Sequence, residues 1–414
     1  MKVVTLTPQQ FDTFMLTSIN SNPWQTTCYG EVMKKFNYDV CYVGFEESGI
    51  LVGASLLISR TVYMGFKHFY APRGIITNYD DVNTLTEIIN EMKKFIFKQK
   101  GLVYTFDPLI IKNLRDRKGN IIAANKSADT IIETITKCNV EFKGDWLYFE
   151  GIQPRFYGSI PMPNTPEKLF ASLSKQIRNK LRKSVKFGIE VFQDETLNID
   201  EMFKIHGKYS KRPIEYYHEL KKNFGNSLEI YYAKINANKY VRSSKHLYEK
   251  AIEKTDQLNN IIQNEGHKGK NMRSVLNKKM EMDKVLSCYK AHLLTATRLL
   301  QDNPEGLIIG VYIVLRHKTS IYLFEESYLK EYGNLSPVHL LRWKIVEKYC
   351  QNASHINIGA VTGEFDKTAN KFKGINEVRL NYGSVAIEYI GEFSHIVNKP
   401  IFSLYNADRI SFRI

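Results

Sequence analysis

The residues best suited to chemistry form a run of cations in the first half of the chain. From Lys175 to Gly188 the sequence contains no Asp or Glu, and apolar residues recur at steps of four. Those steps predict a helix that buries one face and exposes cations on the other. The predicted apolar face comprises Leu173, Ile177, Leu181 and Val185. The cations include Lys180 and, as the expected phosphate contacts, Lys175, Arg178, Arg182, Lys183 and Lys186.

Phosphate groups are the partners that such a helix favours. A nucleic-acid backbone or anionic lipid headgroups would bind it with salt-dependent affinity and without base recognition. The whole chain has 58 Lys and Arg against 43 Asp and Glu, a formal charge of +15. That excess attracts nucleic acid, anionic membrane surfaces or phosphorylated substrates. A solvated charged face, within a generic solubility charge, is the alternative interpretation.

The sequence contains no pattern for covalent or metal catalysis. Its cysteines form no C-x-x-C pair and no Cys/His set at metal-ligand spacing, so buried or incidental thiols are the simpler interpretation. They are Cys28, Cys41, Cys138, Cys288 and Cys350. Nor does a Ser/His/Asp or metal constellation stand out. Their absence is compatible both with an enzyme that needs no such group and with a binding protein.

Length and composition indicate globular domains. A chain of 414 residues is long enough for two domains, and 43% hydrophobic residues with 25 Tyr and 23 Phe predict ordinary cores. The longest apolar runs, such as Ile50–Ile58 and Leu307–Leu315, are strand-sized and far below the roughly 20 residues of a membrane span. The N-terminus lacks a basic-then-apolar signal, so we expect a cytoplasmic protein.

The order of predicted elements suggests a duplicated α/β unit. In each half two strands lead through a loop to a helix and a third strand. In the first half these segments are Ile50–Ser59, Tyr63–Tyr70, Ala71–Gly74, Asp80–Lys100 and Leu102–Phe106. In the second half they are Leu307–Leu315, Ser320–Phe324, the loop with Gly333 and Pro337, Val338–Cys350 and His355–Ile358.

This β-β-α-β order is that of acetyl-coenzyme-A-type acyltransferases, which bind a pyrophosphate on a Gly-rich loop that leads into a helix. The equivalent loops here, Ala71–Tyr79 and Glu331–Val338, contain Gly74 and Gly333 alone. Neither can present the run of backbone N–H groups that a pyrophosphate requires. If the chain is an acyltransferase, we therefore expect no coenzyme A thioester as its acyl donor.

A helical arm divides the second half. From Asn238 to Glu305, apolar or small residues recur at three- and four-residue steps on either side of Gly266 and Gly269. Two narrow stripes of this kind pack against each other in an antiparallel coiled coil, and the glycines permit the reversal. The alternative is a disordered basic loop.

Short motifs in a fixed order accompany these features. They are Gln25, Phe69-Tyr70-Ala71-Pro72-Arg73-Gly74, Phe106-Asp107-Pro108, Ile152-Gln153-Pro154-Arg155, the Arg178 to Ile189 series, Arg212-Pro213-Ile214-Glu215-Tyr216-Tyr217, Lys371-Phe372-Lys373-Gly374 and Glu388 to Phe393. With the arm in its place, the chain resembles the Fem family (the FemABX and MurM–MurN type) over nearly its whole length. Members are aminoacyl-tRNA-dependent peptidyltransferases that add amino acids to the peptide stem of peptidoglycan precursors.

The resemblance implies an α/β (α+β) fold of two acetyltransferase-like (GNAT-like) domains with an inserted antiparallel coiled-coil arm. We expect residues 1–150 to form the first domain, and residues 151–237 and 306–399 the second. The arm would span 238–305, and the tail 400–414 would pack back on the first domain. The arm then becomes an expected tRNA contact, together with the phosphate-binding cations named above.

The reaction that the resemblance implies is attack by a free amine on the ester carbon of an aminoacyl-tRNA. The ester is already activated, so positioning, proton removal and oxyanion stabilisation would suffice. By resemblance, Arg212 and Tyr216 hold the diphosphate of the precursor. A phosphate-binding lysine of the family falls at Met33, where Lys34 or Lys35 would have to replace it.

Further site residues also follow from the resemblance. Lys373 would neutralise the tRNA 3′ end or the oxyanion, although a solvated lysine before Gly374 is the alternative. Asp107 is a candidate base or positioning group, although Asp-Pro is also a common turn. Arg73 would contact the cleft or stabilise its loop. Tyr104 and Tyr322 lie near the expected cleft aromatics.

The expected partners are aminoacyl-tRNA and lipid II or a UDP-linked muropeptide, with no cofactor or metal. We expect peripheral contact with the inner face of the membrane, and a homodimer or heterodimer is left open. Two other functions remain: a non-catalytic tRNA-binding protein, and a Fem-like transferase with a protein or lipid acceptor. The transferred amino acid and the bridge position are not readable from the sequence.

Overall fold

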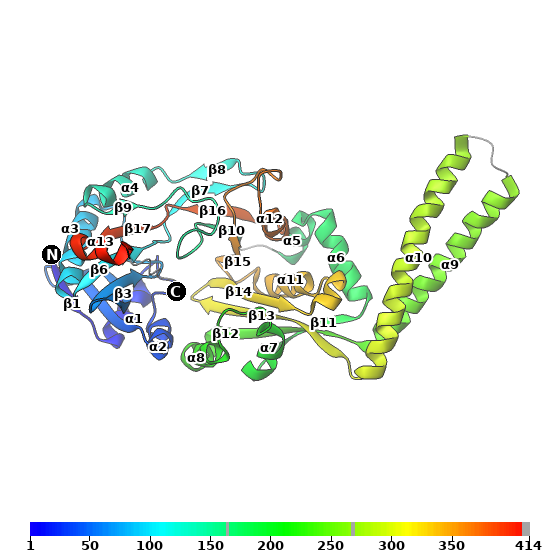
Figure 1. Cartoon of the computed structure of the whole chain (residues 1–414), viewed down its shortest axis with the longest axis horizontal. Coiled ribbons are helices and arrows are strands. Elements are labelled where there is room, and N and C mark those ends of the chain that lie inside the picture. The colour runs from blue at the N-terminus through cyan, green and yellow to red at the C-terminus, as the bar shows by residue number, and fades with distance from the viewer. Residues whose placement is uncertain (163–164, 266–269, 408–414) are drawn as a thin grey trace.

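The computed structural model describes residues 1–162, 165–265 and 270–407, which form two β-sheets and a long pair of helices (Figure 1). The first sheet contains eight described strands in the order β1-β2-β3-β4-β6-β17-β9, with β5 beside β3. The strands are β1 (Lys2–Thr5), β2 (Asp39–Glu47), β3 (Ile50–Tyr63), β4 (Phe66–Ala71), β5 (Ile76–Thr77), β6 (Gly101–Phe106), β9 (Glu141–Phe142) and β17 (Phe393–Ile396). The helices against it are α1 (Pro8–Thr17), α2 (Thr27–Lys35), α3 (Val82–Lys98), α4 (Ala128–Lys137) and α13 (Lys399–Ala407).

The second sheet contains nine described strands in the order β11-β12-β13-β14-β15-β10-β16-β7-β8. They are β7 (Ile111–Arg115), β8 (Ile121–Ala124), β10 (Phe156–Pro161), β11 (Ile189–Asp194), β12 (Leu228–Ile235), β13 (Leu307–His317), β14 (Ser320–Tyr328), β15 (His355–Val361) and β16 (Val385–Tyr389). The helices of this half are α5 (Pro166–Ser172), α6 (Lys175–Lys186), α7 (Ile199–His206), α8 (Ile214–Phe224), α11 (Pro337–Tyr349) and α12 (Lys373–Leu380), with short 3₁₀ turns at Gly225–Ser227 and Lys330–Leu335.

The predicted fold class is confirmed, because one order of elements occurs in both halves. A long antiparallel pair of strands, β3 with β4 or β13 with β14, leads into a helix, α3 or α11. The next strand returns parallel to the second of the pair: β6 beside β4, and β15 beside β14. The strand predicted over Tyr63–Tyr70 is wrong at its start. There, β3 runs on to Tyr63, and Met64 and Gly65, both with positive φ, turn the chain into β4.

Strands exchanged between the halves join the two sheets. Within the range predicted for the first domain, β7 and β8 extend the second sheet through β16. Conversely, β17 lies between β6 and β9 of the first sheet. The tail follows β17, and Tyr405 of α13 packs with Leu102 and Val103 of β6. Residues 408–414 of the predicted tail lie outside the described residues.

An apolar core also links the halves. One buried cluster combines Tyr29 and Met33 of α2 with Tyr216 of α8 and Val311 of β13. Apolar interfaces of this kind hold domains in one arrangement more firmly than polar ones do. The end of α2 and the start of α8 are therefore held beside each other.

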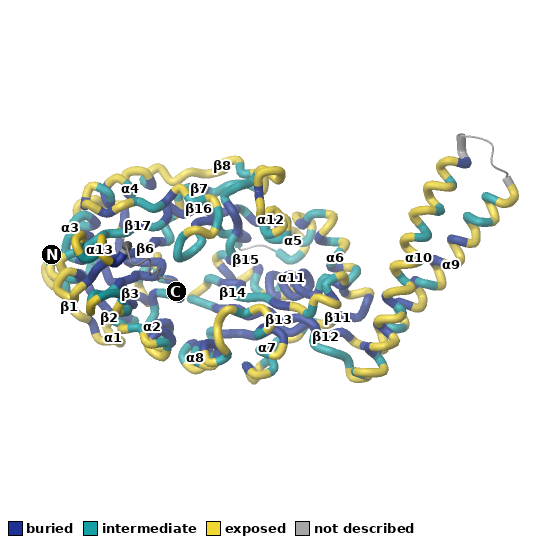
Figure 2. The backbone as a smooth tube through the Cα atoms, viewed as in Figure 1, coloured by how far each residue is buried: buried dark blue, intermediate teal, exposed yellow. Residues whose placement is uncertain are grey.

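The predicted arm is confirmed as two antiparallel helices, α9 (Ala237–Glu265) and α10 (Lys270–Asp302), that pack along their length. Figure 2 shows exposed residues along most of the arm, with buried positions on the inner side. On α9 these positions are Ser244, Leu247, Ala251 and Thr255, the three- and four-residue spacing of a paired helix. The predicted reversal at Gly266 and Gly269 lies outside the described residues. No described helix is long and apolar enough to cross a membrane.

Candidate functional site

Arg212 stands immediately before α8 and meets two aromatic rings. Its guanidinium carbon lies 4.5 Å from the centre of the Tyr216 ring and 5.5 Å from that of Phe324. The Arg212 side chain is 43% exposed, whereas Tyr216 is buried. A guanidinium held in this way can donate two parallel hydrogen bonds to phosphate oxygens. The structure thus brings together Arg212 and Tyr216, the pair expected to bind the diphosphate.

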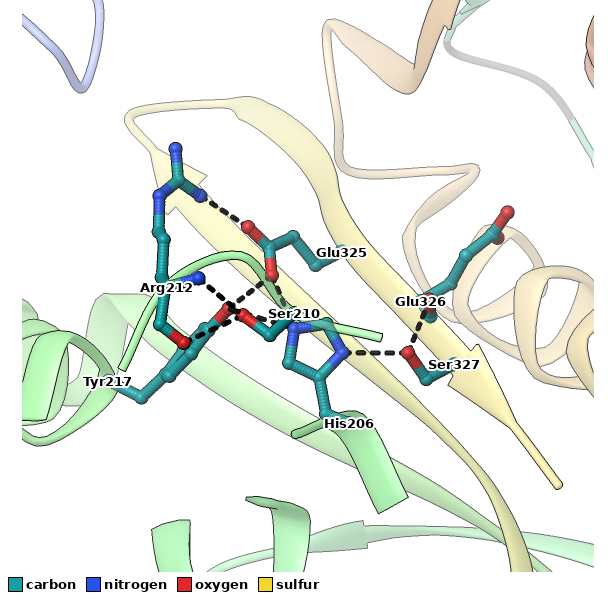
Figure 3. Close-up of polar contacts among 7 residues, drawn as sticks. All are labelled: His206, Ser210, Arg212, Tyr217, Glu325, Glu326 and Ser327. Carbon is teal, nitrogen blue, oxygen red and sulfur yellow. Dashed lines mark hydrogen bonds and ion pairs between the residues drawn. The ribbon is translucent and has the colours of Figure 1, made fainter. Parts of the chain in front are cut away.

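Glu325 of β14 anchors a polar network behind Arg212 (Figure 3). Its carboxylate pairs with Arg212, accepts a hydrogen bond from the Tyr217 hydroxyl (2.6 Å) and lies 2.5 Å from Nε2 of His206. The other ring nitrogen of His206 lies 2.7 Å from the Ser327 hydroxyl. Burial alone would raise the pKa of Glu325, but the hydrogen bond from His206 and the charge of Arg212 hold that pKa below its usual value. Glu325 is therefore an ionised counter-charge to Arg212.

Glu326, the next residue of β14, projects away from this network (Figure 3), because alternate side chains of a strand point to opposite faces. Its carboxylate pairs with Arg342 of α11 at 2.5 Å and lies 4.0 Å from Arg379 of α12. Arg342 is fully buried and Glu326 is 24% exposed. Burial opposes ionisation of Glu326, but the two arginines lower its pKa.

A cavity of about 730 Å³ opens on this second face of β14. Its walls come from α6, the segment that leads into α11, and α12. The charged and titratable residues that line it are Lys180, Lys183, Glu326, Tyr328, His339 and Arg379. A cavity of this size can hold a nucleoside or an aminoacyl group, and it offers one ionised carboxylate among several cations.

The cation-rich α6 forms one wall of that cavity. Lys175, Arg182 and Lys186, three of the expected phosphate contacts, are exposed, whereas Arg178 and Lys183 are half-buried. The prediction for Val185 is wrong, since Val185 is 49% exposed. Ser184 takes the buried position instead, because its hydroxyl donates a hydrogen bond to the carbonyl of Leu335 at 2.7 Å.

Asp107 and Arg73, both of the first half, form a buried ion pair at its boundary with the second half. Their side chains are 4% and 3% exposed, with Nη1 of Arg73 3.1 Å from Oδ2 of Asp107. Tyr70 donates a hydrogen bond to Asp107 (2.9 Å), and Arg73 donates to the Tyr157 hydroxyl (2.8 Å). Burial raises the pKa of Asp107 in spite of Arg73. The adjoining cavity measures about 10 Å³, room for one water at most, so the structure brings Asp107 and Arg73 together in a pair with no room for a substrate beside it.

The lysines at the end of α2 lie at the surface. Met33 is buried in the same apolar cluster as Tyr216, whereas Lys34 and Lys35 are exposed. Lys34 pairs with Glu31 at 2.6 Å. The position at which the family carries a lysine thus lies beside Tyr216, but its side chain here is apolar.

The remaining candidates are dispersed. Tyr104 is fully buried and stacks on Phe106 in the first half, whereas Tyr322 packs on Trp24 and lines an interdomain cavity of about 350 Å³. Lys373 is exposed at the start of α12. It lines a cavity of about 370 Å³ with Arg117 and Lys118 of the β7–β8 turn.

Sequence reasoning missed several residues of the site, namely Lys180 as a cavity residue, His206, Glu325, Glu326, His339 and Arg342. One signal was available for two of them. Glu325 and Glu326 interrupt an otherwise apolar strand, and a pair of carboxylates at adjacent strand positions must face opposite sides. For Arg342, the neighbours Leu340, Leu341, Trp343, Ile345 and Val346 are apolar, and an arginine among them indicates a buried partner.

The chain is similar to known proteins over nearly its whole length. The model of the FemAB family matches residues 6–408. Two curated relatives, both "Aminoacyltransferase FemA" of Staphylococcus aureus (strains bovine RF122 / ET3-1 and NCTC 8325 / PS 47), are each 22% identical to this chain and are covered over 98% of both sequences. A crystal structure of FemX superposes with a TM-score of 0.71 at 18% identity, over 98% of this chain and 99% of that one. That structure therefore has the same fold.

Proposed function

Because this chain belongs to the FemAB family, we propose that it is an aminoacyltransferase that moves an amino acid from aminoacyl-tRNA to the stem peptide of a peptidoglycan precursor. The acceptor would be lipid II or a UDP-linked muropeptide, and the product an interpeptide bridge or branch. The relatives named aminoacyltransferases support the transfer of an aminoacyl group.

The observation that carries the proposal is the pair of sites on opposite faces of β14. On one face Arg212 lies over Tyr216 with its guanidinium partly exposed. On the other face Glu326 borders the 730 Å³ cavity beside α6. Glu325 and Glu326 are neighbours in sequence, so a diphosphate on Arg212 and an acyl donor in the cavity would be held by one strand.

The two substrates place different demands on these faces. A diphosphate on Arg212 competes with Glu325, whose carboxylate holds the guanidinium in place before the ligand arrives. The phosphates of a tRNA acceptor end would follow the exposed cations of α6. Glu326 is paired with Arg342 but is 24% exposed, and the α-ammonium of the donor amino acid would approach its exposed part, because a carboxylate in a confined site favours a cation.

The chemistry needs no cofactor in this proposal. The amine nitrogen attacks the ester carbon, and the bond to the ribose oxygen of the tRNA breaks. Coenzyme A is not expected, since the loop before α11 contains Gly333 and no glycine-rich run. We further propose that the protein works in the cytoplasm at the inner face of the membrane, where a lipid-linked precursor would be accessible.

A transfer assay tests the proposal directly. Radiolabelled Gly-, Ala-, Ser- or Leu-tRNA would be mixed with lipid II or with a UDP-linked muropeptide, and the labelled precursor separated. Wild-type protein should transfer at least one amino acid to a muropeptide. Arg212→Ala should raise the KM for the precursor while tRNA binding is retained. Tight, salt-sensitive tRNA binding without transfer to any precursor would instead support a non-catalytic tRNA-binding protein, and transfer to protein or lipid would support another acceptor.

A further inference from the structure

Lys180 differs from the other cations of α6 because its amine contacts a histidine at the cavity wall. It lines the cavity beside Glu326, and its Nζ lies 3.1 Å from Nε2 of His339 on α11. Among the described residues, no carboxylate lies within ion-pairing distance of that amine. By contrast, the Lys183 ammonium lies over the ring of Phe187, 5.7 Å from its centre. Lys180 is therefore presented to the cavity by a neutral partner.

The hydrogen bonds of His339 determine which of its nitrogens faces Lys180. The Tyr382 hydroxyl donates to the His339 backbone carbonyl at 3.1 Å, so its oxygen accepts from Nδ1–H at 2.8 Å. Nε2 then carries the lone pair and accepts a hydrogen bond from Lys180. Burial, together with the charges of Arg342 and Lys180, lowers the pKa of His339 to about 3. The ring is neutral at physiological pH.

The charges around Lys180 make its ammonium form costly. The charge of Arg342 on α11 acts on the amine. Lys183 of α6, Arg379 of α12 and the neutral Tyr328 of β14 line the same cavity, and Glu326 of β14 is paired with Arg342. Burial first, and then the charge of Arg342, lower the pKa of Lys180, with Glu377 of α12 opposing them. A desolvated lysine beside cations is the setting in which an amine becomes a usable base.

We propose that Lys180 accepts the proton of the attacking ammonium, and that His339 is the positioning residue that holds the Lys180 amine toward the cavity. This inference rests on the proposed function. The neutral Lys180 amine takes one proton from the acceptor ammonium, and the freed nitrogen attacks the ester carbon. As the C–N bond forms and the C–O bond breaks, a second proton of that nitrogen passes to the ribose oxygen. Lys180 then releases its proton to water, so the reaction yields an amide, a free ribose hydroxyl and one proton.

The first test compares charge with basicity. Lys180→Arg keeps the cation but cannot accept a proton at physiological pH. A purely phosphate-binding lysine would tolerate this change, whereas a base would not. We expect kcat to fall about 100-fold or more in Lys180→Arg, within the usual contribution of general base catalysis, with the KM for aminoacyl-tRNA little changed. The control is Lys344→Arg, the same substitution at a lysine that is exposed on α11 and pairs with Glu347. It should leave kcat unchanged.

The pH profile separates His339 from a merely structural residue. In wild-type protein kcat should rise with pH through a pKa below that of an ordinary lysine. In His339→Ala this rise of kcat should occur at higher pH, because water then reaches the Lys180 amine and its pKa returns toward that of an ordinary lysine. His339→Gln should restore most of the activity, since the Gln carbonyl can accept the same hydrogen bond.

A labelling experiment provides a readout without catalysis. Acetic anhydride acylates neutral amines, and the rate at each lysine of the folded protein can be followed by mass spectrometry from pH 6 to 10. Lys180 should react at lower pH than Lys344, and His339→Ala should reduce the difference. Lys180 titrating together with Lys344 would overturn the inference, as would full activity of Lys180→Arg in an active enzyme. No transfer by the wild-type protein, with early labelling of Lys180, would overturn the proposed function itself.

Discussion

The buried charge of Arg342 leads to a sharp prediction for Glu326→Leu. Arg342 is fully buried and its carboxylate partner is Glu326, 2.5 Å away. Removing one partner of a buried pair costs roughly 3–5 kcal/mol, because the remaining charge is uncompensated. Glu326 is 24% exposed, and the Tyr382 ring lies 5.0 Å from the guanidinium, so we expect the lower end of that range. At about 3 kcal/mol, and with an unfolding entropy of about 2.1 cal/mol/K per residue over 414 residues, the Tm should fall by roughly 3–4 °C.

Two further variants make this prediction refutable. Replacing both partners, in Glu326→Leu with Arg342→Met, should recover at least about 2 kcal/mol of the loss, since an apolar pair replaces a buried ion pair at little cost. Glu31→Leu serves as a control, because Glu31 pairs with Lys34 at the surface and should change stability by about 0.5 kcal/mol or less. Thermal unfolding followed by circular dichroism gives all four Tm values. A Glu326→Leu protein as stable as the control, or a double variant less stable than Glu326→Leu, would refute the reasoning.

Three other perturbations test separate parts of the account. Asp107→Asn leaves the charge of Arg73 buried at the boundary of the halves, so the Tm should fall by several degrees; an unchanged Tm with abolished transfer would indicate a catalytic role instead. Burial raises the pKa of Glu392 to about 7, so its protonated form stabilises the fold below the unfolded pKa of about 4.3, and this contribution is lost as pH rises through 7. Glu392→Gln should therefore raise the Tm at pH 8 but not at pH 4, and equal gains at both values would contradict the assignment. Replacing Asn238–Glu305 by a short Gly-Ser linker should raise the KM for aminoacyl-tRNA while precursor affinity, measured by calorimetry, is retained; lost precursor affinity in a folded protein would contradict the role of the arm.

The features predicted well from the sequence are those specified locally. The arm repeats its three- and four-residue spacing over many turns of two long helices, α9 and α10. A pattern of that length identifies helices without ambiguity. The duplicated strands are continuous apolar runs bounded by turn residues, and their order alone indicates the acetyltransferase-like unit. The contact between Arg212 and Tyr216 is also local, since Arg212 lies just before α8 and Tyr216 in its first turn; the diphosphate-binding role of the pair stays a prediction.

The features that the sequence could not predict depend on contacts between distant segments. β17 pairs with β6 although their residues are nearly 300 positions apart, and no local pattern specifies that partner. Val185 fits the periodicity of α6, but the carbonyl of Leu335 selects Ser184 for the buried position. Lys180 and Lys183 look alike in sequence, and the position of His339 on α11 distinguishes them.

The central claim, transfer of an amino acid to the stem of a peptidoglycan precursor, is tested most directly by mass spectrometry of muropeptides. Walls from a strain that lacks this protein would be compared with those from strains that carry the wild-type protein or Arg212→Ala. The account predicts muropeptides lighter by one or more amino-acid residues in the deletion strain, restored by the wild-type protein and not by Arg212→Ala. Identical muropeptide masses in all three strains would contradict it.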